Sequence, residues 1–574
     1  MSSLFAATLI ALNLLAAEPK ATHLYPSAIT RGVFPVLVVT EGDTGTDPKI
    51  WTDDEALKLI PGPKAGQFLA SAAPGCRVGW HVVRLHNKEG VSRPILLWVD
   101  DLRNLAEAEP NDHHEKAAVV LASPGSVRVH GRLERNGDVD GFRVHVPKGV
   151  TLTARVTANR FLASPMDATL QIVDTKGFVL AHNDDTRGTD PELVWTSPET
   201  GDVIVRLFAF PSDPNSTIGF AGGSAYIYSL LLATGPTIDR VAPIAIDAKP
   251  GDVPLFGWNL PADAHAPFVV PAPDSDFALI ALEGSEPHPA LRSAFPVTMA
   301  DAKGETRLTP PVLAYGYWPE PAGRTRFRIT AKKGENWNFR IFAKRWETPA
   351  DPVLILKKAD GTVVAEQDDS GNNNRDVDFA WTVPDDGEYL AEVTDLHRRG
   401  GPRFAFGLEV TKDGLPPELL IELKNVEIKA GDRKEITLTF DKRAAIDEPV
   451  KLTFEGLPKG FPEPKTADPA TPAPAEPAKK KSGRRRGGNA PAQTTIKYVA
   501  TITADEAKAI GAWSGPVRAY ATDDTGKKYP VRFAAAGDPW PRIGSDHLWL
   551  TVIPPEPPKD AKKDEKKDEP KKAG

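Results

Sequence analysis

The side chains best suited to chemistry in this sequence are oxygen donors gathered between positions 107 and 140. Carboxylates and one carboxamide occupy the two ends of this stretch, and the part between them alternates like a strand. Hard cations such as Ca²⁺ bind several carboxylate and amide oxygens from turn-rich segments. The stretch therefore predicts a calcium site at the edge of a β-sandwich. Its six oxygen-bearing side chains are Glu107, Glu109, Asn111, Asp112, Asp138 and Asp140.

A solvated acidic linker is the alternative interpretation of the same residues. Pro110 stiffens the segment, and Asn111 and Asp112 can close a turn on themselves. Carboxylates at this density repel one another unless a cation lies between them. The calcium interpretation is therefore favoured, and the expected role of the ion is structural: it holds the linker against the sheet.

Motifs for catalysis are absent from the sequence. It contains no His-Glu-x-x-His and no Gly-x-Ser-x-Gly, and residues 113–115 (His-His-Glu) lack further ligands at zinc spacing. The single cysteine, Cys76, is expected to be a buried thiol and allows no intramolecular disulfide. These observations favour a non-catalytic protein. A secreted hydrolase or a peptidase-associated subunit stays open as the alternative, because a catalytic triad is assembled in space and not along the sequence.

Length and composition indicate several β-domains. A chain of 574 residues is too long for one core, and its 55 prolines and 46 glycines favour short strands joined by turns. The net charge is only −7 and the basic residues of the globular part are scattered, which argues against nucleic acid as a partner. We therefore expect an all-β, multidomain protein in which jelly-roll-like β-sandwiches alternate with immunoglobulin-like modules.

An internal repeat divides the chain. Asp167 and Asp351 are followed at the same offsets by apolar residues, a glycine and an acidic turn, and the same spacing of seven separates Phe142 from Gly149 and Phe327 from Gly334. So many shared offsets predict two copies of one β-domain. The matched positions after the two aspartates are Leu170 with Leu354, Ile172 with Leu356, Gly177 with Gly361, and Asn183-Asp184-Asp185 with Gln367-Asp368-Asp369.

The second copy departs from the first at the acidic stretch. Gly323 and Thr325 occupy the positions that match Asp138 and Asp140. We therefore expect the second copy to keep the fold without this calcium site. Its loop 368–378 is rich in oxygen donors but is expected to be a hydrated turn.

The remaining segments complete the predicted organisation. An apolar run at the start, ending in small residues, indicates a signal peptide, and no later run is long enough to cross a membrane. Residues 51–60 are expected to include one helical turn. The predicted boundaries are 1–17 for the signal peptide, 18–104 for an immunoglobulin-like domain, 105–236 for the first β-sandwich, 237–304 for a small immunoglobulin-like module, 305–413 for the second β-sandwich, 414–553 for an immunoglobulin-like domain with a disordered insertion at 462–493, and 554–574 for a disordered charged tail.

Four tryptophans gather along the second copy. Trp337 and Trp381 lie in strand-like runs and are expected in its core. Trp318 and Trp346 lie near prolines in loops and are the better candidates for a ligand-binding surface.

The first copy resembles a known family. Glu-x-Glu-x-Asn-Asp, a Gly-x-Leu strand, Asp-x-Asp before an aromatic residue, and a Gly turn leading to Asn-Asp-Asp look like the bacterial pre-peptidase C-terminal domain over residues 107–234, and in part over 305–413. That family is a jelly-roll-type sandwich similar to the collagen-binding domains of clostridial collagenases. It occurs beside peptidases and in non-enzymatic surface proteins. The resemblance carries the calcium ligands onto the same six residues, and the order of modules resembles secreted proteins of planctomycete-type bacteria.

These inferences combine into one functional expectation. The chain is expected to be exported, to the periplasm, cell surface or extracellular space, and to be non-catalytic. A calcium-stabilised domain would mediate binding or adhesion to an extracellular protein or polysaccharide of unknown identity.

Overall fold

The computed structural model describes residues 17–121, 123–213, 219–247, 249, 251–268, 277–301, 303–346, 348–370, 375–412, 414–423, 425–446, 449–466, 493–533 and 546–555. Three predicted segments lie largely outside these ranges. Positions 1–16 of the predicted signal peptide, 467–492 of the predicted insertion and 556–574 of the predicted tail lie outside the described residues.

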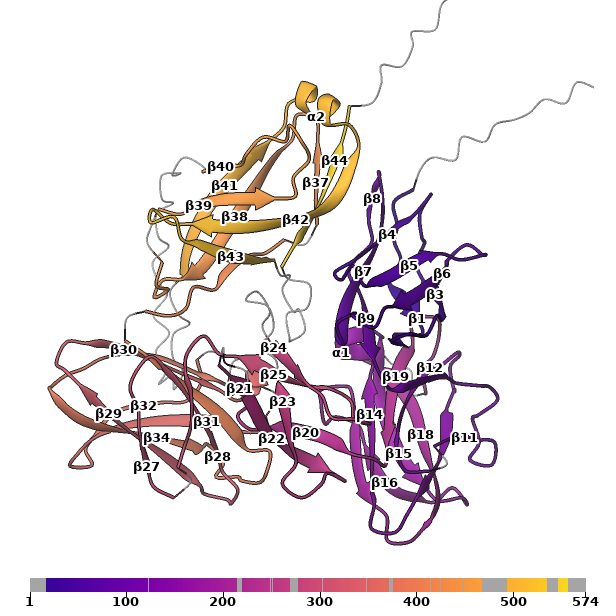
Figure 1. Ribbon diagram of the computed structural model, residues 1–574, viewed down its shortest axis with the longest axis horizontal. Helices are drawn as coiled ribbons and strands as arrows, with labels where there is room; N and C mark the ends of the chain where they lie inside the picture. The colour runs from indigo at the N-terminus through magenta and orange to yellow at the C-terminus, as the bar shows by residue number, and fades with distance from the viewer. Residues whose placement is uncertain are drawn as a thin grey trace, which may run out of the picture.

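The described chain is almost entirely β-structure, which confirms the predicted fold class (Figure 1). Its helices are α1 (Asn159–Leu162), α2 (Ala504–Ile510) and the 3₁₀ turn η1 (Lys344–Trp346). Thr503 caps α2, accepting the backbone N–H of Glu506 while the Glu506 carboxylate accepts the N–H of Thr503. No helix among the described residues is long and apolar enough to cross a membrane.

The N-terminal domain is a sandwich of two sheets, with strand orders β1-β3-β6-β5 and β2-β9-β7-β4. The predicted helical turn at 51–60 is wrong. Leu57 and Leu59 are buried while Lys58 and Ile60 are exposed, and this period of two is that of a strand. The strands are β1 (His23–Tyr25), β2 (Ala28–Thr30), β3 (Val36–Glu41), β4 (Lys49–Thr52), β5 (Leu57–Pro61), β6 (Gln67–Ala72), β7 (Gly79–Asn87), β8 (Gly90–Val91) and β9 (Ile95–Asp100).

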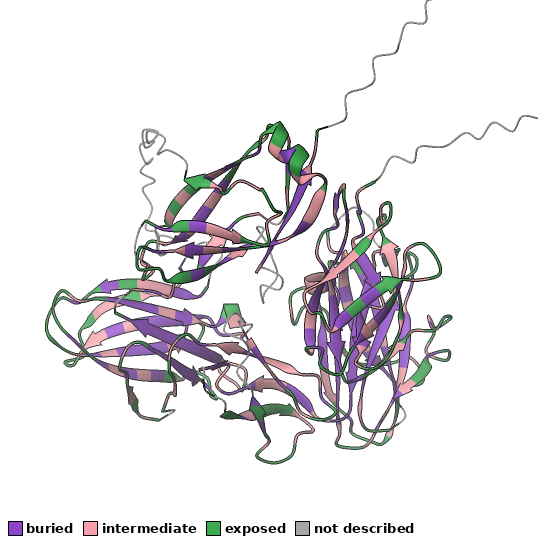
Figure 2. Ribbon diagram, turned by 45° about the horizontal axis from the view of Figure 1, so that its top comes forward, coloured by how far each residue is buried: buried purple, intermediate pink, exposed green. Residues whose placement is uncertain are grey.

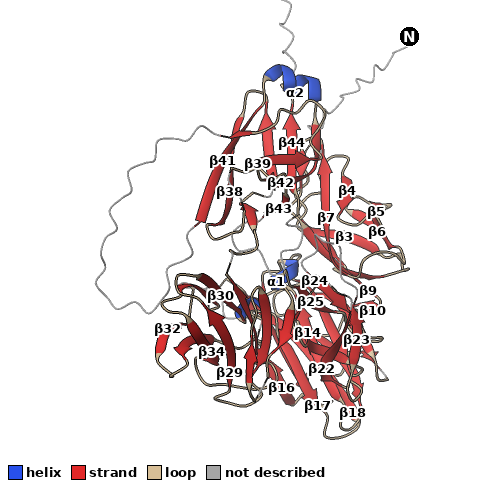
Figure 3. Cartoon of the chain, turned by 60° about the vertical axis from the view of Figure 1, so that its left-hand side comes forward, coloured by secondary structure: helices blue, strands red, loops and turns tan. Residues whose placement is uncertain are grey.

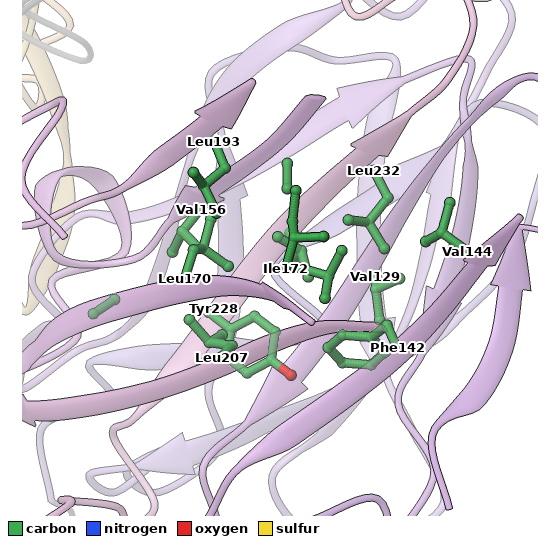
Figure 4. Packing of buried hydrophobic residues seen from close by; sticks show 14 of the residues in the cluster. Val129, Phe142, Val144, Val156, Leu170, Ile172, Leu193, Leu207, Tyr228 and Leu232 are labelled. Atoms are coloured by element: carbon green, nitrogen blue, oxygen red, sulfur yellow. The ribbon is translucent and has the colours of Figure 1, made fainter. Parts of the chain in front are cut away.

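The first sandwich packs two five-stranded sheets, ordered β10-β12-β19-β14-β17 and β11-β13-β18-β15-β16. Alternate side chains from both sheets meet in one core, part of which Figure 4 shows. The strands are β10 (Arg103–Ala106), β11 (Ala118–Leu121), β12 (Ser126–Arg132), β13 (Asp140–Val146), β14 (Thr151–Thr157), β15 (Met166–Val173), β16 (Val179–Asn183), β17 (Glu192–Thr196), β18 (Gly201–Pro211) and β19 (Ile227–Ala233).

The second sandwich has the same strand order, β26-β28-β35-β30-β33 facing β27-β29-β34-β31-β32. Its first strand pairs at 297–299, before the expected start of this copy at 305. The strands are β26 (Val297–Met299), β27 (Glu305–Arg307), β28 (Val312–Tyr317), β29 (Arg324–Ala331), β30 (Asn336–Phe342), β31 (Pro352–Lys358), β32 (Val363–Gln367), β33 (Val377–Thr382), β34 (Gly387–Asp395) and β35 (Ala405–Thr411).

The two sandwiches also agree residue by residue. Leu170 pairs with Leu207 in the first, and Leu354 pairs with Val393 in the second. The repeated offsets in the sequence therefore fall on equivalent sheet positions.

A small module separates the sandwiches, with sheets ordered β20-β22-β23 and β21-β25-β24 around a core of its own. Its strands are β20 (Thr237–Val241), β21 (Ala245–Ile246), β22 (Gly251–Trp258), β23 (His265–Phe268), β24 (Phe277–Ile280) and β25 (His288–Arg292).

The C-terminal domain joins strands from both sides of the predicted insertion. The short β40 lies inside the predicted insertion 462–493, so residues 465–466 are a strand there and not disordered; β40 pairs with β41, which begins at residue 493. The strands are β36 (Leu419–Ile421), β37 (Asn425–Lys429), β38 (Arg433–Asp441), β39 (Lys451–Glu455), β40 (Lys465–Thr466), β41 (Gln493–Thr501), β42 (Trp513–Thr522), β43 (Lys528–Phe533) and β44 (Leu548–Ile553).

The N-terminal and C-terminal domains contact each other, and Figure 3 shows β7 beside the C-terminal domain. Arg84 Nη1 donates to Asn425 Oδ1 at 2.7 Å, and the ring of Trp51 lies 5.8 Å from that of Trp549. Buried residues fill each domain in turn (Figure 2). The chain is thus a series of separate β-cores, with contact between the first and the last.

Candidate cation site of the first sandwich

Three segments of the first sandwich position the acidic residues. Glu107 directly follows β10, and its N–H donates to the carbonyl oxygen of His130 at 2.8 Å. Its Oε1 accepts the N–H of Arg132 at 2.6 Å, so the carboxylate turns in toward β12. Asp138 lies in the turn after β12, and Asp140 begins β13. The turn between these strands therefore faces the segment that leaves β10.

Three of the predicted ligands converge. Glu109, Asp138 and Asp140 each present a carboxylate oxygen within 4.8 Å of the others. The side chains of Asp138 and Asp140 are fully buried, whereas Glu109 is exposed at the edge. Glu109 also accepts the N–H of Asn111 at 3.0 Å, which closes the turn that brings Asn111 inward.

Several buried polar atoms at this place have no hydrogen-bond partner among the described residues. They include Oδ1 of Asp138, Oδ1 of Asp140 and both polar atoms of the Asn111 side chain, which is 1% exposed. A buried polar atom without a partner costs about 1–3 kcal/mol. Oxygens left unpaired beside converging carboxylates are the donors that a hard cation requires, so the residues present fit Ca²⁺.

Burial perturbs the acids of this cluster strongly. It raises the pKa of Asp140 to about 10, with the charge of Glu107 as the next cause. Burial also raises the pKa of Glu107 to about 7 and raises the pKa of Asp138. Without a cation the cluster therefore retains protons near neutral pH, and a bound divalent ion would favour the ionised forms.

The hydroxyl of Tyr228 contacts the carboxyl groups of both Glu107 and Asp140. The hydroxyl oxygen lies 2.5 Å from Asp140 Oδ2 and 2.9 Å from Glu107 Oε2. A hydroxyl has one proton, so it donates to one carboxyl group, and the second contact requires that the other group be protonated. The raised pKa values of both acids agree with this shared proton. The ring of Tyr228 lies in the core with Phe142 (Figure 4).

Sequence reasoning missed Tyr228, because it lies on β19, far along the chain from the acidic stretch. Gly131, which pairs with Tyr228 on the neighbouring strand, is the sequence feature that could have indicated this contact. A Cβ at Gly131 would lie 2.0 Å from the Tyr228 hydroxyl oxygen and 2.4 Å from Glu107 Oε2. Only glycine leaves room for this contact between ring and carboxylate.

Asp112 has a different position from the other predicted ligands. Its Oδ2 forms an ion pair with Arg135 at 3.1 Å, and its Oδ1 accepts the N–H of Val139 at 3.4 Å. Both oxygens therefore have protein partners at the rim. Glu107 lies beneath the converging acids, and Glu109, Asn111, Asp138 and Asp140 form the inner donor set.

The second sandwich has other residue types at the equivalent places. The two copies share one backbone hydrogen bond that aligns them. The N–H of Glu107 donates to the carbonyl oxygen of His130 in the first copy, and the N–H of Ala300 donates to that of Tyr315 in the second. Its loop 368–378 also has structural contacts: Asp376 accepts the N–H groups of Ala343, Lys344 and Arg345. The residues equivalent to Glu107, Gly131, Asp140 and Tyr228 are Ala300, Gly316, Thr325 and Phe406.

The tryptophans of the second sandwich correct one prediction. Trp337 and Trp381 are buried in the core, as predicted. Trp318 is also buried, 1% exposed, so the prediction that it belongs to a ligand surface is wrong. Its ring stacks on Phe406 at 4.7 Å, and Gly323 leaves the space for it. Trp346 is half-buried and lines a cavity.

Cys76 lies in the second cluster of potential metal ligands found among the described residues. Its Sγ is 3.8 Å from His81 Nε2 and 3.8 Å from Asp54 Oδ2. His81 Nε2 also lies 2.6 Å from the Arg77 carbonyl oxygen, and Nδ1 lies 3.0 Å from Asp53 Oδ1. Both ring nitrogens of His81 therefore lie within hydrogen-bond distance of an oxygen atom.

The thiol itself is not activated. Cys76 is buried as predicted, and burial raises its pKa to about 12. A nucleophilic cysteine requires the opposite shift. This cluster therefore has the geometry of a structural contact and not of a cysteine nucleophile.

No family model matches the chain, and no curated protein matches it. Among solved structures, the chain is similar to the pre-peptidase C-terminal domain of a collagenase from Bacillus anthracis, at 11% identity over 19% of this chain and 95% of that chain, with a TM-score of 0.15. It is similar to immunoglobulin domains 1–4 of Sidekick-1, at 10% identity over 94% and 99% of the two chains, with a TM-score of 0.20. It is also similar to SGBP-B of Bacteroides ovatus, solved in complex with a mixed-linkage heptasaccharide, at 9% identity over 69% and 76%, with a TM-score of 0.13. Likeness at this level carries no conclusion about activity or ligand.

Proposed function

We propose that this chain is an exported, non-catalytic, modular β-protein whose first sandwich is stabilised by calcium and which binds an extracellular protein or polysaccharide at the cell surface. The calcium site is supported by three buried side-chain oxygens that have no hydrogen-bond partner in the described part of the chain, those of Asn111, Asp138 and Asp140. A cation supplies the missing partner of all three.

The ion would act by ordering the connection between the two sheets of the first sandwich. Residues 107–117 run from β10 to β11, and β10 itself follows closely on β9 of the N-terminal domain. The two domains already touch there, since Arg128 Nε donates to Asp100 Oδ2 at 2.9 Å and Tyr25 Oη donates to the His130 carbonyl oxygen at 3.0 Å. A cation on Asp138 and Glu109 would hold the segment after β10 against the turn before β13, within the sandwich that forms this junction. An ordered sandwich loses less conformational entropy when the chain engages a ligand.

The test is thermal unfolding of the full chain with calcium and with chelator. At a free calcium concentration about 100 times Kd, binding stabilises the folded state by about 2.7 kcal/mol. Asp138→Asn should remove most of that difference. The matched control is Asp184→Asn, the same substitution at an exposed position of the same sandwich, and it should leave the calcium effect intact. Identical unfolding of the unmodified chain in calcium and in chelator would refute the calcium site.

A further inference from the structure

A cavity of about 610 Å³ lies where four of the five domains meet. Its walls include Trp80 of β7, Arg155 of β14, Phe277 of β24 and Lys344 of η1, one from each domain. Sites for small ligands have volumes of about 300–1,000 Å³ and are common between domains, so the size and place both suit a ligand.

The described lining is strongly basic in a chain whose net charge is −7. Six arginines and Lys344 line the cavity, and four carboxylates, from Asp100, Glu192, Asp239 and Glu286, contact four of those arginines. A basic lining in a partly enclosed space favours an anion. The arginines are Arg128, Arg155, Arg160, Arg187, Arg240 and Arg403.

The carboxylates hold the guanidinium groups in fixed positions. Glu286 accepts from Arg128 Nη2 at 2.8 Å and from Arg155 Nη1 at 2.7 Å. Glu192 accepts from Arg155 Nε at 3.1 Å and from Arg403 Nη2 at 2.9 Å. Side chains held in this way lose little further freedom when they bind a ligand.

One N–H donor group of this network, on Arg155, has no acceptor among the described residues. Nη2 of Arg155 is buried and has no hydrogen-bond partner among the described residues, although the other two nitrogens of the same guanidinium group are bonded. Buried donors are almost always paired in folded proteins. An acceptor brought by a ligand would satisfy this one.

Aromatic rings form the other part of the wall. Trp80 stacks on Phe161 with ring centroids 4.9 Å apart, and it meets Trp98 edge-on at 5.1 Å. Trp346 adds a further ring from the second sandwich. Aromatic rings therefore line the cavity next to guanidinium groups.

We propose that this cavity binds an acidic sugar, a pyranose ring that bears a carboxylate. The carboxylate matches the fork of an arginine. The C–H face of the ring matches the flat aromatic wall, which an acidic peptide of glutamate or aspartate cannot cover in the same way. This inference rests on the proposal that the chain is a binding protein, but it does not depend on the calcium site.

The test is calorimetric titration of the full chain with digalacturonic acid at one fixed calcium concentration. The matched neutral probe is its methyl ester, which has the same rings and blocked carboxylates. The acid should bind, and its ester should bind at least tenfold more weakly. Binding of the acid should weaken as salt is raised, because the attraction is partly screened. Diglutamate is titrated in parallel to represent an acidic peptide.

Two variants locate the binding. Lys344→Gln and Arg240→Gln each remove one lining charge without removing a guanidinium group from Glu192 or Glu286. Each should weaken the binding of digalacturonic acid about tenfold, the loss of one charge-assisted hydrogen bond. Lys333→Gln is the control, since this lysine is exposed on the same sandwich and does not line the cavity. Calorimetric unfolding of each variant shows that it is folded.

The outcomes separate the possibilities. Equal binding of acid and ester, binding of diglutamate but not of the acid, equal affinity of Lys344→Gln and the unmodified chain, or no binding of the acid would each overturn the proposal. The calcium experiment uses no sugar, so a failure here leaves its result intact.

Discussion

Raising the pH of the chelated protein is predicted to destabilise its first sandwich. Burial raises the pKa of Asp140 from an ordinary 3.8 to about 10. Between these values the unfolded chain has lost a proton that the folded chain keeps, so the stability present at acid pH is lost as the pH rises toward the folded pKa. One proton corresponds to about 1.4 kcal/mol per pH unit, or about 3 kcal/mol between pH 5 and pH 7.

Calcium is predicted to cancel this dependence. The ion binds ionised carboxylates, so its binding releases the proton of Asp140, and its affinity should rise by up to about tenfold per pH unit below pH 8. The assay is scanning calorimetry of the full chain from pH 5 to pH 8, with chelator or with calcium. The transition of the first sandwich is the one that moves in Asp140→Asn.

Asp140→Asn distinguishes this account from a general effect of pH. The amide cannot titrate, so the pH dependence of that transition in chelator should become nearly flat, and calcium should no longer stabilise it. Asp184→Asn, at an exposed position, should keep both effects. A first sandwich that gains stability in chelator between pH 5 and pH 8 would refute the raised pKa and the reasoning built on it.

Three further substitutions test the packing around the sites. Gly131→Ala should destabilise the first sandwich by about 1–3 kcal/mol in calorimetry, because its Cβ would meet the Tyr228 hydroxyl; no loss would contradict the close contact. Trp318→Ala should cost the second sandwich about 3–5 kcal/mol in urea unfolding, whereas an effect near zero would mean that the ring is not in the core. Glu286→Gln leaves the guanidinium groups of Arg128 and Arg155 without their shared carboxylate and should cost about 3–5 kcal/mol; unchanged resistance to limited proteolysis at the small module would refute its bridging role.

The repeat was predictable because its signals are local. Each sandwich turns after β13 or β29 at a glycine, Gly149 or Gly334, with φ near +80° (φ 78 and 84), a conformation that other residues avoid. Such turns and the alternation between them are visible in the sequence. The acidic donors were visible for the same reason, since Glu109 and Asn111 lie in one turn and Asp138 and Asp140 in another.

What the sequence did not reveal depends on pairing between distant strands. Tyr228 reaches Asp140 only because β19 lies beside β12. Trp318 was predicted on a surface because prolines surround it, but it packs on Phe406 from β35, a strand far along the chain. The ion pairs of Glu286 also join separate domains, and no spacing in the sequence indicates them.

The two sandwiches separate the requirements of the fold from those of the site. Gly131 and Gly316 occupy the same position, and in both copies a Cβ there would clash with the aromatic residue on the neighbouring strand, at 2.0 Å from Tyr228 Oη and 2.6 Å from Phe406 Cζ. Glycine opposite an aromatic ring therefore belongs to the packing that both copies share. The ring of the first copy differs by a hydroxyl, and that hydroxyl is the atom that contacts Glu107 and Asp140.

The residue type at position 228 or 406 must match the polarity of the side chains buried around it. A phenylalanine at position 228 would leave Glu107 and Asp140 buried without their shared donor, and a tyrosine at position 406 would bury a hydroxyl where the second copy offers only Ala300 and Thr325. Tyr228→Phe should therefore weaken calcium binding without removing an inner donor. Phe406→Tyr should destabilise the second sandwich in calcium and in chelator alike. If Tyr228→Phe left calcium affinity unchanged, the hydroxyl would be a packing feature and the cation site would consist of the acidic turns alone.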